Sequence, residues 1–530
     1  MPPALAKRKT TPIDLLDLAI ENRFIEALPA DRLVDNVPRH VPNACYTRVA
    51  PTPVRESRLL AWSDALATQL GIGTPSPAAV DVLGGNRLLE GMQPYAARYG
   101  GHQFGGWAGQ LGDGRAITLG EVIDAEGERQ ELQLKGAGPT PYSRRADGRA
   151  VLRSSLREYL CSEAMHFLGV PTTRALSLVG TGEAVIRDMF YDGRPAAEPG
   201  AVVCRVAPSF VRFCNFQIHA AYREEDLLRR LVAYVMREHF PGITDVGSWY
   251  QEICRRTALL MVDWMRLGFV HGVMNTDNMS VLGLTIDYGP YGWLEGYDPS
   301  WTPNTTDAHR RRYSYGNQPG IAQWNLTRLA EALMPLVARE PLEAGLTLFG
   351  DVYRDASAQA FAQKLGLSGL DQDGDDALLN DLFKVMGESE TDFTIWFRNL
   401  ALVPLDGADD AALVEPLRAA FYDASVLDGE HRGRVAGWLR SYVGRLRRDG
   451  GNPATRVERM NAVNPKYVPR NYLAQLAIDA LTLGDASVLE RLMRVLARPY
   501  DAQPGCEDLA ARRPEWARNR PGCSALSCSS

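Results

Sequence analysis

The chain has 530 residues, of which 45% are hydrophobic and 23% charged, and its formal net charge is -6. This is an ordinary globular composition, long enough for two or three domain-sized units. The acidic balance argues against general nucleic-acid binding, and no apolar run approaches the roughly 20 residues that span a bilayer, so we expect no nucleic-acid partner, no membrane segment and a cytoplasmic location.

Composition and hydrophobic periodicity divide the chain into five expected regions. They are an N-terminal extension packed on the core (1–85), a glycine-rich nucleotide-binding lobe (86–215), a helical lobe with a polar loop (216–345), a helical C-terminal region (346–500) and a cysteine-containing tail (501–530). The tail ends in CSALSCSS, and its polar composition predicts that it is flexible and exposed.

Apolar periodicity also predicts individual helices. We expect them over 59–70, ended by Gly71, over 249–267, ended by Gly268, and over 324–338, 376–386 and 413–448. The acidic segment DQDGDD at 371–376 lacks the glutamate that closes a calcium loop, because Leu382 stands there, and is interpreted as a solvated turn.

A glycine-rich segment, YGGHQFGGWAGQLGDGRAITLGEV (residues 99–122), opens the second region. Glycines let the backbone approach phosphates closely, although such loops more often only make turns. The next strand, residues 131–135, alternates and ends with Lys135, as the phosphate-binding lysine strand of kinase-like folds does. This order favours phosphate binding.

A helix carrying Leu156, Leu160 and Glu158 follows this strand. The separation of Lys135 and Glu158 is compatible with the ion pair that turns the lysine toward nucleotide phosphates. Ser155 to Glu158 also fits a capping box, in which the glutamate binds only a backbone N–H. The order of the motifs along the chain favours the ion pair.

Two arginines lie seven residues apart between the two lobes, in VCRVAPSFVRF. Guanidinium groups bind phosphate oxygens in a fork, although surface salt bridges are their commoner use. Arg205 and Arg212 are therefore candidates for phosphate binding.

The polar loop HGVMNTDNMSVLGLTIDYG, residues 271–289, carries the strongest signal. His271 and Asn278 keep the spacing of a kinase catalytic loop, but Val273 stands where the general-base aspartate is expected. A different carboxylate, Asp277, comes directly before the asparagine. The loop predicts a nucleotide site without ordinary phosphoryl transfer.

The end of this loop predicts a β-hairpin. Residues 279–281 and 284–286 read as strands around a two-residue turn at Leu282-Gly283. That register places Asn278 opposite Asp287, where an amide oxygen and a carboxylate can share one Mg²⁺ or Mn²⁺. A surface hairpin with polar ends is the alternative.

These motifs, together with NPKYVPRNYLAQ and the terminal CSS, resemble, nearly end to end, the selenoprotein-O family of protein adenylyltransferases. The resemblance implies an α+β, protein-kinase-like (pseudokinase) bilobal fold with an N-terminal extension and a helical C-terminal region. It also implies transfer of AMP from ATP to Ser, Thr or Tyr hydroxyls of proteins, with ATP bound in a flipped orientation.

The resemblance further assigns site residues. It implies Asp277 as the proton acceptor, Asn278 and Asp287 as ligands of Mg²⁺ or Mn²⁺, and the following ATP contacts: Gly112, Gly114, Arg115, Lys135, Asp147, Gly148, Glu158, Arg205, Arg212 and Asp287.

One position departs from the family pattern. Some members carry a cysteine in the loop after the metal site that suits a disulfide with a C-terminal cysteine, whereas Pro303 stands there in this chain. Redox switching through that pair is not expected, and the role of Cys528 stays open.

Two alternatives to AMP transfer remain at this point. One is an atypical kinase that uses Asp277 as its base and transfers the γ-phosphate, and the other is a silent ATP-binding pseudokinase that acts as an interaction module. Expected partners are hydroxyl-bearing protein substrates, including redox-related proteins, and a monomer is expected.

Overall fold

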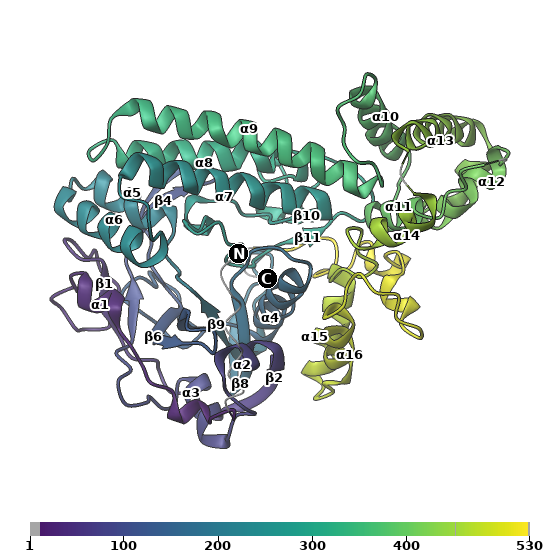
Figure 1. Cartoon of the computed structure of the whole chain (residues 1–530). Coiled ribbons are helices and arrows are strands. Elements are labelled where there is room, and N and C mark those ends of the chain that lie inside the picture. Colours follow the sequence, from purple (N-terminus) through teal and green to yellow (C-terminus); the bar gives the residue numbers. More distant parts are fainter. Residues whose placement is uncertain (1–10, 407, 451, 528–530) are drawn as a thin grey trace.

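The structure is a computed structural model that describes residues 11–406, 408–450 and 452–527. Strands concentrate in the first 210 residues and helices after them, as Figure 1 shows. The expected α+β class, with a sheet lobe followed by a helical lobe in the order of a protein-kinase-like fold, is confirmed. Within the described ranges, no helix is both long and apolar enough to cross a membrane.

An antiparallel sheet forms the first lobe, in the order β1-β3-β6-β7-β9-β8-β2. Its strands are β1 (Tyr46–Arg48), β2 (Arg58–Trp62), β3 (Tyr95–Ala97), β6 (Ala116–Ile123), β7 (Arg129–Lys135), β8 (Arg174–Arg187) and β9 (Ala196–Ala207). Two small sheets pair β4 (Gly100–Gln103) with β5 (Gly106–Gln110) and β10 (Phe269–Val270) with β11 (Gly292–Trp293).

Both faces of this sheet are covered, as the apolar strand β9 illustrates. Successive residues of a strand point to opposite faces. Val203 packs with Leu156 and Leu160 of α4 (Leu152–Phe167), whereas Val202 packs on the other face with Leu66 and Leu83 of the N-terminal extension. The sheet therefore holds the ends of its strands rigidly.

The N-terminal extension differs in part from its prediction. It contains η1 (Leu15–Asp17), α1 (Arg23–Ala27), α2 (Asp64–Leu70) and α3 (Pro77–Gly84). The helix predicted from residue 59 begins only at Asp64, because residues 58–62 pair with β8 as β2 and the hydroxyl of Ser63 accepts the backbone N–H of Leu66 as an N-cap.

The second lobe is helical, with the long helices stacked at the top of Figure 1. Its helices are α5 (Phe213–Ala221), α6 (Glu225–His239), α7 (Val246–Leu267), α8 (Gln318–Leu333) and α9 (Arg339–Lys364), with η2 (Thr276–Asn278), η3 (Thr305–Asp307) and η4 (Tyr315–Asn317) between α7 and α8. The predicted helix before the polar loop is α7, which packs along α9. Asp245 caps its start and Gly268 ends it, so the chain enters the loop from a fixed point.

Further helices follow on the right of Figure 1. They are α10 (Asp375–Gly387), α11 (Phe393–Leu400), α12 (Asp410–Val414), η5 (Glu415–Ala420), η6 (Ala424–Asp428), α13 (Glu430–Asp449), α14 (Pro453–Asn461), α15 (Asn471–Thr482), α16 (Ser487–Leu496), η7 (Glu507–Ala510) and η8 (Glu515–Ala517). The continuous helix predicted over 413–448 is wrong, because α12 continues directly as η5, and breaks around Phe421 and Gly429 separate η5 from η6 and η6 from α13.

The end of the described chain packs against the core. Cys523 and Leu526 are buried, and the backbone N–H of Leu526 donates to the carbonyl of Pro303 at 2.9 Å. The expectation of an exposed tail is therefore wrong for residues 523–526, because the apolar side chains there pack beside the loop that follows β11. Cys528 lies outside the described residues.

Candidate active site

A cavity of 620 Å³ lies between the sheet and the polar loop of the helical lobe. Most of the predicted site residues line it: Gly112, Gly114, Arg115, Lys135, Gly148, Arg205, Arg212, Asp277, Asn278 and Asp287. Glu158 lies behind Lys135, and Asp147 is not among the lining residues. The fold thus brings residues from both lobes to one cavity.

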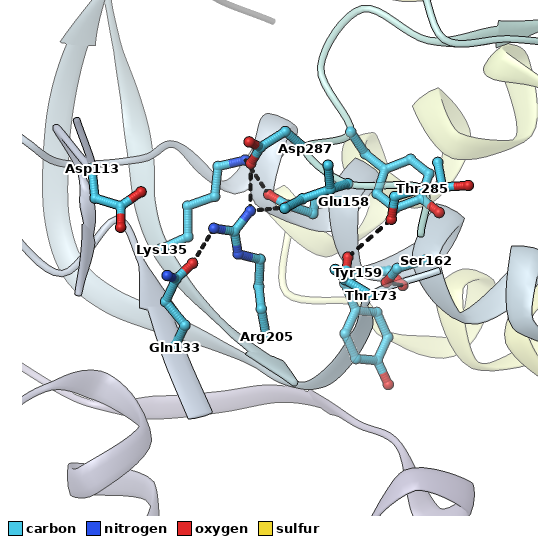
Figure 2. A network of polar contacts seen from close by, with 12 residues as sticks. Asp113, Gln133, Lys135, Glu158, Tyr159, Ser162, Thr173, Arg205, Thr285 and Asp287 are labelled. Atoms are coloured by element: carbon cyan, nitrogen blue, oxygen red, sulfur yellow. Dashed lines mark hydrogen bonds and ion pairs between the residues drawn. The ribbon is translucent and has the colours of Figure 1, made fainter. Parts of the chain in front are cut away.

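Charged residues from four parts of the chain meet at one wall of this cavity (Figure 2). Lys135 at the end of β7 lies 2.7 Å from Glu158 of α4 and 3.2 Å from Asp287 of the polar loop. Arg205 of β9 contacts the same two carboxylates, at 3.0 Å and 2.5 Å. The predicted Lys135–Glu158 ion pair is therefore present, within a larger network.

The capping-box alternative for Glu158 is wrong. Helix α4 begins at Leu152 with Val151 as its N-cap, so Ser155 lies inside the helix, and its hydroxyl contacts the carbonyl of Ala201. Glu158 faces two cations instead of a free backbone N–H.

Asp287 is the most heavily contacted carboxylate of the network. Besides Lys135 and Arg205 it pairs with Arg212, whose guanidinium also donates to the carbonyl of Asp277 at 2.8 Å. Burial alone would raise the pKa of Asp287, but Arg212, Lys135 and Arg205 outweigh it and hold the pKa well below its usual range. Asp287 is therefore ionised at neutral pH.

His271 anchors the polar loop. Its Nε2 donates to the carbonyl of Ile286 at 2.9 Å, and its ring stacks on Trp264 of α7. Burial lowers the pKa of His271, which keeps the ring neutral. This contact joins the start of the loop to the residue that precedes Asp287.

The hairpin predicted after Asn278 is wrong. Ser280 bridges to Arg212 and Thr285 bridges to Thr172, so the two segments pair with other parts of the chain and not with each other. A turn still forms, in which the backbone N–H of Gly283 donates to the carbonyl of Ser280 at 3.2 Å, but the residues on either side of it bridge to Arg212 and Thr172. Asn278 and Asp287 nevertheless line the same cavity.

Asp277 lies in the short helix η2 at the floor of the loop. One carboxylate oxygen, Oδ2, accepts a hydrogen bond from the amide of Gln103 at 3.1 Å. Burial raises the pKa of Asp277 to about 6, although Arg212 and Gln103 oppose the shift. A carboxylate with a pKa in this range can accept a proton at neutral pH.

The glycine-rich segment has two halves. Residues 100–110 form the β4–β5 hairpin, which lines the cavity through Gln103 and Phe104, and the second half lines it through Gly112 and Gly114. A Cβ on Gly112 would lie 2.3 Å from the ring of Tyr142, so this glycine permits close packing of the chain against that ring. The structure thus gives Gly112 a packing reason in addition to the predicted nucleotide contact.

Asp147 is placed differently from the other predicted contacts. Its carboxylate is about half exposed, pairs with Arg187 at 2.6 Å and accepts the backbone N–H of Arg149 at 2.9 Å. It holds the cavity rim in place, and direct contact with ATP stays a prediction.

Comparison with known proteins identifies the family of this chain. A model described as protein adenylyltransferase SelO matches residues 35–497. The chain belongs to the SelO family. Similar relatives, each described as protein nucleotidyltransferase YdiU, come from Nitrosospira multiformis (61% identical, covering 98% of this chain and 97% of the relative), Azoarcus sp. (57%, 97% and 99%) and Rhodopirellula baltica (54%, 97% and 99%).

Among solved structures, the chain matches ROP2 from Toxoplasma gondii, described as a virulence factor with a protein-kinase fold and no enzymatic activity. The TM-score is 0.21 at 14% identity, with 66% of this chain and 83% of that chain covered. So low a score supports no conclusion about this SelO-family chain.

The donor set at the cavity fits a small hard cation that is shared with a nucleotide. Asn278 uses its amide nitrogen to donate to the carbonyl of Val273 at 2.8 Å, which leaves the amide oxygen for a ligand. Asp287 supplies carboxylate oxygens at the same cavity. No cluster of three or more His, Cys, Asp or Glu side chains that could hold a metal occurs in the described ranges.

Two polar residues of the site were missed by the sequence analysis. Gln133 bonds to Arg205, and its position two residues before Lys135 on the same strand face could have indicated it. Gln103 carried no signal, because its contact with Asp277 joins residues 174 positions apart.

Proposed function

We propose that this SelO-family chain transfers AMP from ATP to Ser, Thr or Tyr hydroxyls of proteins and releases pyrophosphate. The observation that carries the proposal is the position of Asp277, whose carboxylate lines the cavity directly beside Asn278, while Val273 occupies the place of a kinase base. The names of the relatives, protein nucleotidyltransferases, support the same chemistry.

The cation network suits the phosphates of ATP. Lys135, Arg205 and Arg212 pair with the carboxylates of Glu158, Asp287 and Asp113, and Arg115 adds a further cation to the lining of the cavity. Guanidinium and ammonium groups form charge-assisted hydrogen bonds with phosphate oxygens. We infer that the β- and γ-phosphates bind this wall, which leaves the α-phosphorus toward Asp277 and the acceptor.

The proton and the leaving group then have defined destinations. The acceptor oxygen forms a bond with the α-phosphorus while the bond from that phosphorus to the bridging oxygen breaks. The hydroxyl proton moves to Asp277, a transfer worth about 10²–10⁴-fold in rate. Pyrophosphate leaves toward Lys135, Arg205 and Arg212, which stabilise its charge.

Asn278 and Asp287 are the residues that would hold Mg²⁺ or Mn²⁺. When bound there, the metal would neutralise charge on the phosphates. Asp287 is already fixed by Arg205 and Arg212, so its carboxylate is oriented before any ligand arrives.

A product analysis tests this proposal. The purified protein is incubated with ATP, a divalent metal and a hydroxyl-rich test protein, and both proteins are examined by mass spectrometry while pyrophosphate is assayed. An AMP adduct on a hydroxyl, with one pyrophosphate released per adduct, is expected. A phosphate adduct with ADP release would establish the kinase alternative instead.

Three further expectations stay predictions. A cytoplasmic location, a monomeric state and redox-related protein substrates rest on the sequence alone. A role for Cys528 likewise awaits measurement, since that residue lies outside the described ranges.

A further inference from the structure

The β4–β5 hairpin is attached to the polar loop by three consecutive residues. The backbone N–H of His102 donates to the Thr276 hydroxyl at 2.8 Å, the side chain of Gln103 donates to Asp277 at 3.1 Å, and the N–H of Phe104 donates to the Asn275 side chain at 3.1 Å. Each residue of the loop from 275 to 277 thus has its own partner on the hairpin. These hydrogen bonds hold residues 275–277 of the polar loop against the hairpin.

The close approach of the two segments depends on Gly101. A Cβ at this position would lie 2.3 Å from the Thr276 hydroxyl and 2.8 Å from Cβ of Cys214. Contacts this short cannot form without displacement of the backbone. In this part of the glycine-rich segment, residues 100–106, glycine therefore permits close contact with the polar loop. The sequence had suggested contact with phosphate instead.

A second anchor fixes the tip of the hairpin. The Asn275 side-chain oxygen accepts from both Phe104 N–H and the hydroxyl of Tyr313, which is itself buried. Phe104 adopts a φ of 50°, a left-handed conformation that is uncommon for a bulky residue and persists only where the surroundings hold it. Gln103 is therefore presented from a rigid element.

The two oxygens of Asp277 differ in their surroundings. Oδ2 accepts the amide of Gln103, whereas Oδ1 is shielded from water and has no hydrogen-bond partner in the described part of the chain. A shielded oxygen without a partner is costly, so the position of this carboxylate depends on the hydrogen bond that Gln103 donates to Oδ2. Both Gln103 and Asp277 line the cavity.

We propose that Gln103 is a positioning residue that holds Asp277 by Oδ2 and thereby fixes the orientation of this carboxylate toward the acceptor hydroxyl. This inference rests on the proposed function and deepens it, because it assigns the orientation of the base to the hairpin. Gln103 cannot take the proton itself, since its amide donates to Asp277 and has no basic site at neutral pH.

The test compares two glutamines of the same hairpin. Gln103→Met keeps the length of the side chain but removes the donor, and Gln103→Glu replaces the donor with a charge that repels Asp277. Gln110→Met is the matched control, because Gln110 bonds to Arg39 and Val41 and not to the polar loop. Transfer of α-phosphate label to the test protein is measured at saturating ATP, with the melting temperature and ATP affinity of each variant.

Both Gln103 variants are expected to lower kcat by about 10- to 100-fold, the size of effect that misplacement of a catalytic group by about 1 Å produces. The KM for ATP and the melting temperature should stay near those of the unmodified chain, as should kcat of Gln110→Met. An unchanged kcat in Gln103→Met, or an equal loss in Gln110→Met, would overturn the inference.

Failure of the proposed function gives a different pattern. If the unmodified chain transferred only γ-phosphate label, AMP transfer would be excluded, but the same comparison of kcat, made with γ label, would still decide whether Gln103 positions Asp277. A loss of γ transfer confined to the Gln103 variants would support the positioning role.

Discussion

Glu158 contacts Arg205 as well as Lys135, with Oε1 3.0 Å from the guanidinium and Oε2 2.7 Å from the ammonium group. One buried carboxylate from α4 therefore orients two cations that come from adjacent strands of the sheet. The sequence predicted an ion pair of Glu158 with Lys135 alone. Helix α4 therefore helps to position Lys135 and Arg205, two of the cations that we propose to bind the phosphates.

Glu158→Gln should weaken ATP binding by about 10- to 100-fold, because hydrogen bonds to charged groups are worth about 1.5–3 kcal/mol and two cations lose their anchor together. Binding is measured by calorimetry with ATP and metal. Glu331→Gln on α8 is the control, since Glu331 pairs with Arg328 and is about half exposed. Equal affinity in Glu158→Gln and the unmodified chain would contradict this function of Glu158.

Asp277→Asn should lower transfer of α-phosphate label by about 10²–10⁴-fold, because the amide cannot accept the hydroxyl proton. ATP affinity should change little, because the substitution keeps the backbone carbonyl that accepts from Arg212, and the Asp277 side chain bonds to Gln103 rather than to the cations of the network. Asp298→Asn, in an exposed turn, serves as the control for an aspartate substitution. Full activity in Asp277→Asn would show that another group accepts the proton.

Removal of the divalent metal should stop transfer, and added Mg²⁺ or Mn²⁺ should restore it. Asn278→Ala removes one of the two proposed ligands, so we expect the metal concentration for half-maximal activity to rise at least about 10-fold. A metal titration of transfer measures this. Transfer that persists with a chelator present would exclude the metal site at Asn278 and Asp287.

Glu224 does not line the cavity, and its shifted pKa predicts a pH-dependent contribution to the free energy of unfolding. Burial raises its pKa, but hydrogen bonds from His219 and Arg98 outweigh burial and lower the pKa to about 2. A carboxyl group whose pKa is lower in the folded than in the unfolded protein stabilises the folded state at pH values above its unfolded pKa, near 4.5. This stabilisation is lost as the pH falls through about 2.

Glu224→Gln should therefore lower the free energy of unfolding by about 2–3 kcal/mol at pH 7, and the difference from the unmodified chain should shrink as the pH falls from about 4.5 toward 2. Urea denaturation over this range measures it. Glu225→Gln, at the exposed start of α6, is the control. A difference that stays constant with pH would contradict the assignment.

Local patterns predicted much of this molecule. Strand β7 and helix α7 follow from alternation, apolar periodicity and end signals, and Lys135 and Glu158 follow from the order of motifs. These features depend on neighbours within a few residues or on a known motif order. The predicted hairpin after Asn278 failed because residues 172 and 212, distant in sequence, provide the backbone partners.

The supports of the site could not be predicted in the same way. Gln103 reaches Asp277, Arg205 reaches Glu158, and Leu526 reaches Pro303 only after the lobes and the C-terminal segment have packed together. Nothing in the local sequence of a glutamine on a glycine-rich hairpin distinguishes it from a surface residue. Long-range packing decides these contacts.

The central claim is that AMP, and not phosphate, is transferred. The most direct measurement incubates the protein, a divalent metal and a hydroxyl-rich test protein with ATP labelled at either the α- or the γ-phosphate, and follows label on protein, with Asp277→Asn as a parallel blank. We expect label from the α position only, and about 10²–10⁴-fold less of it in the variant. Label from the γ position only would contradict it.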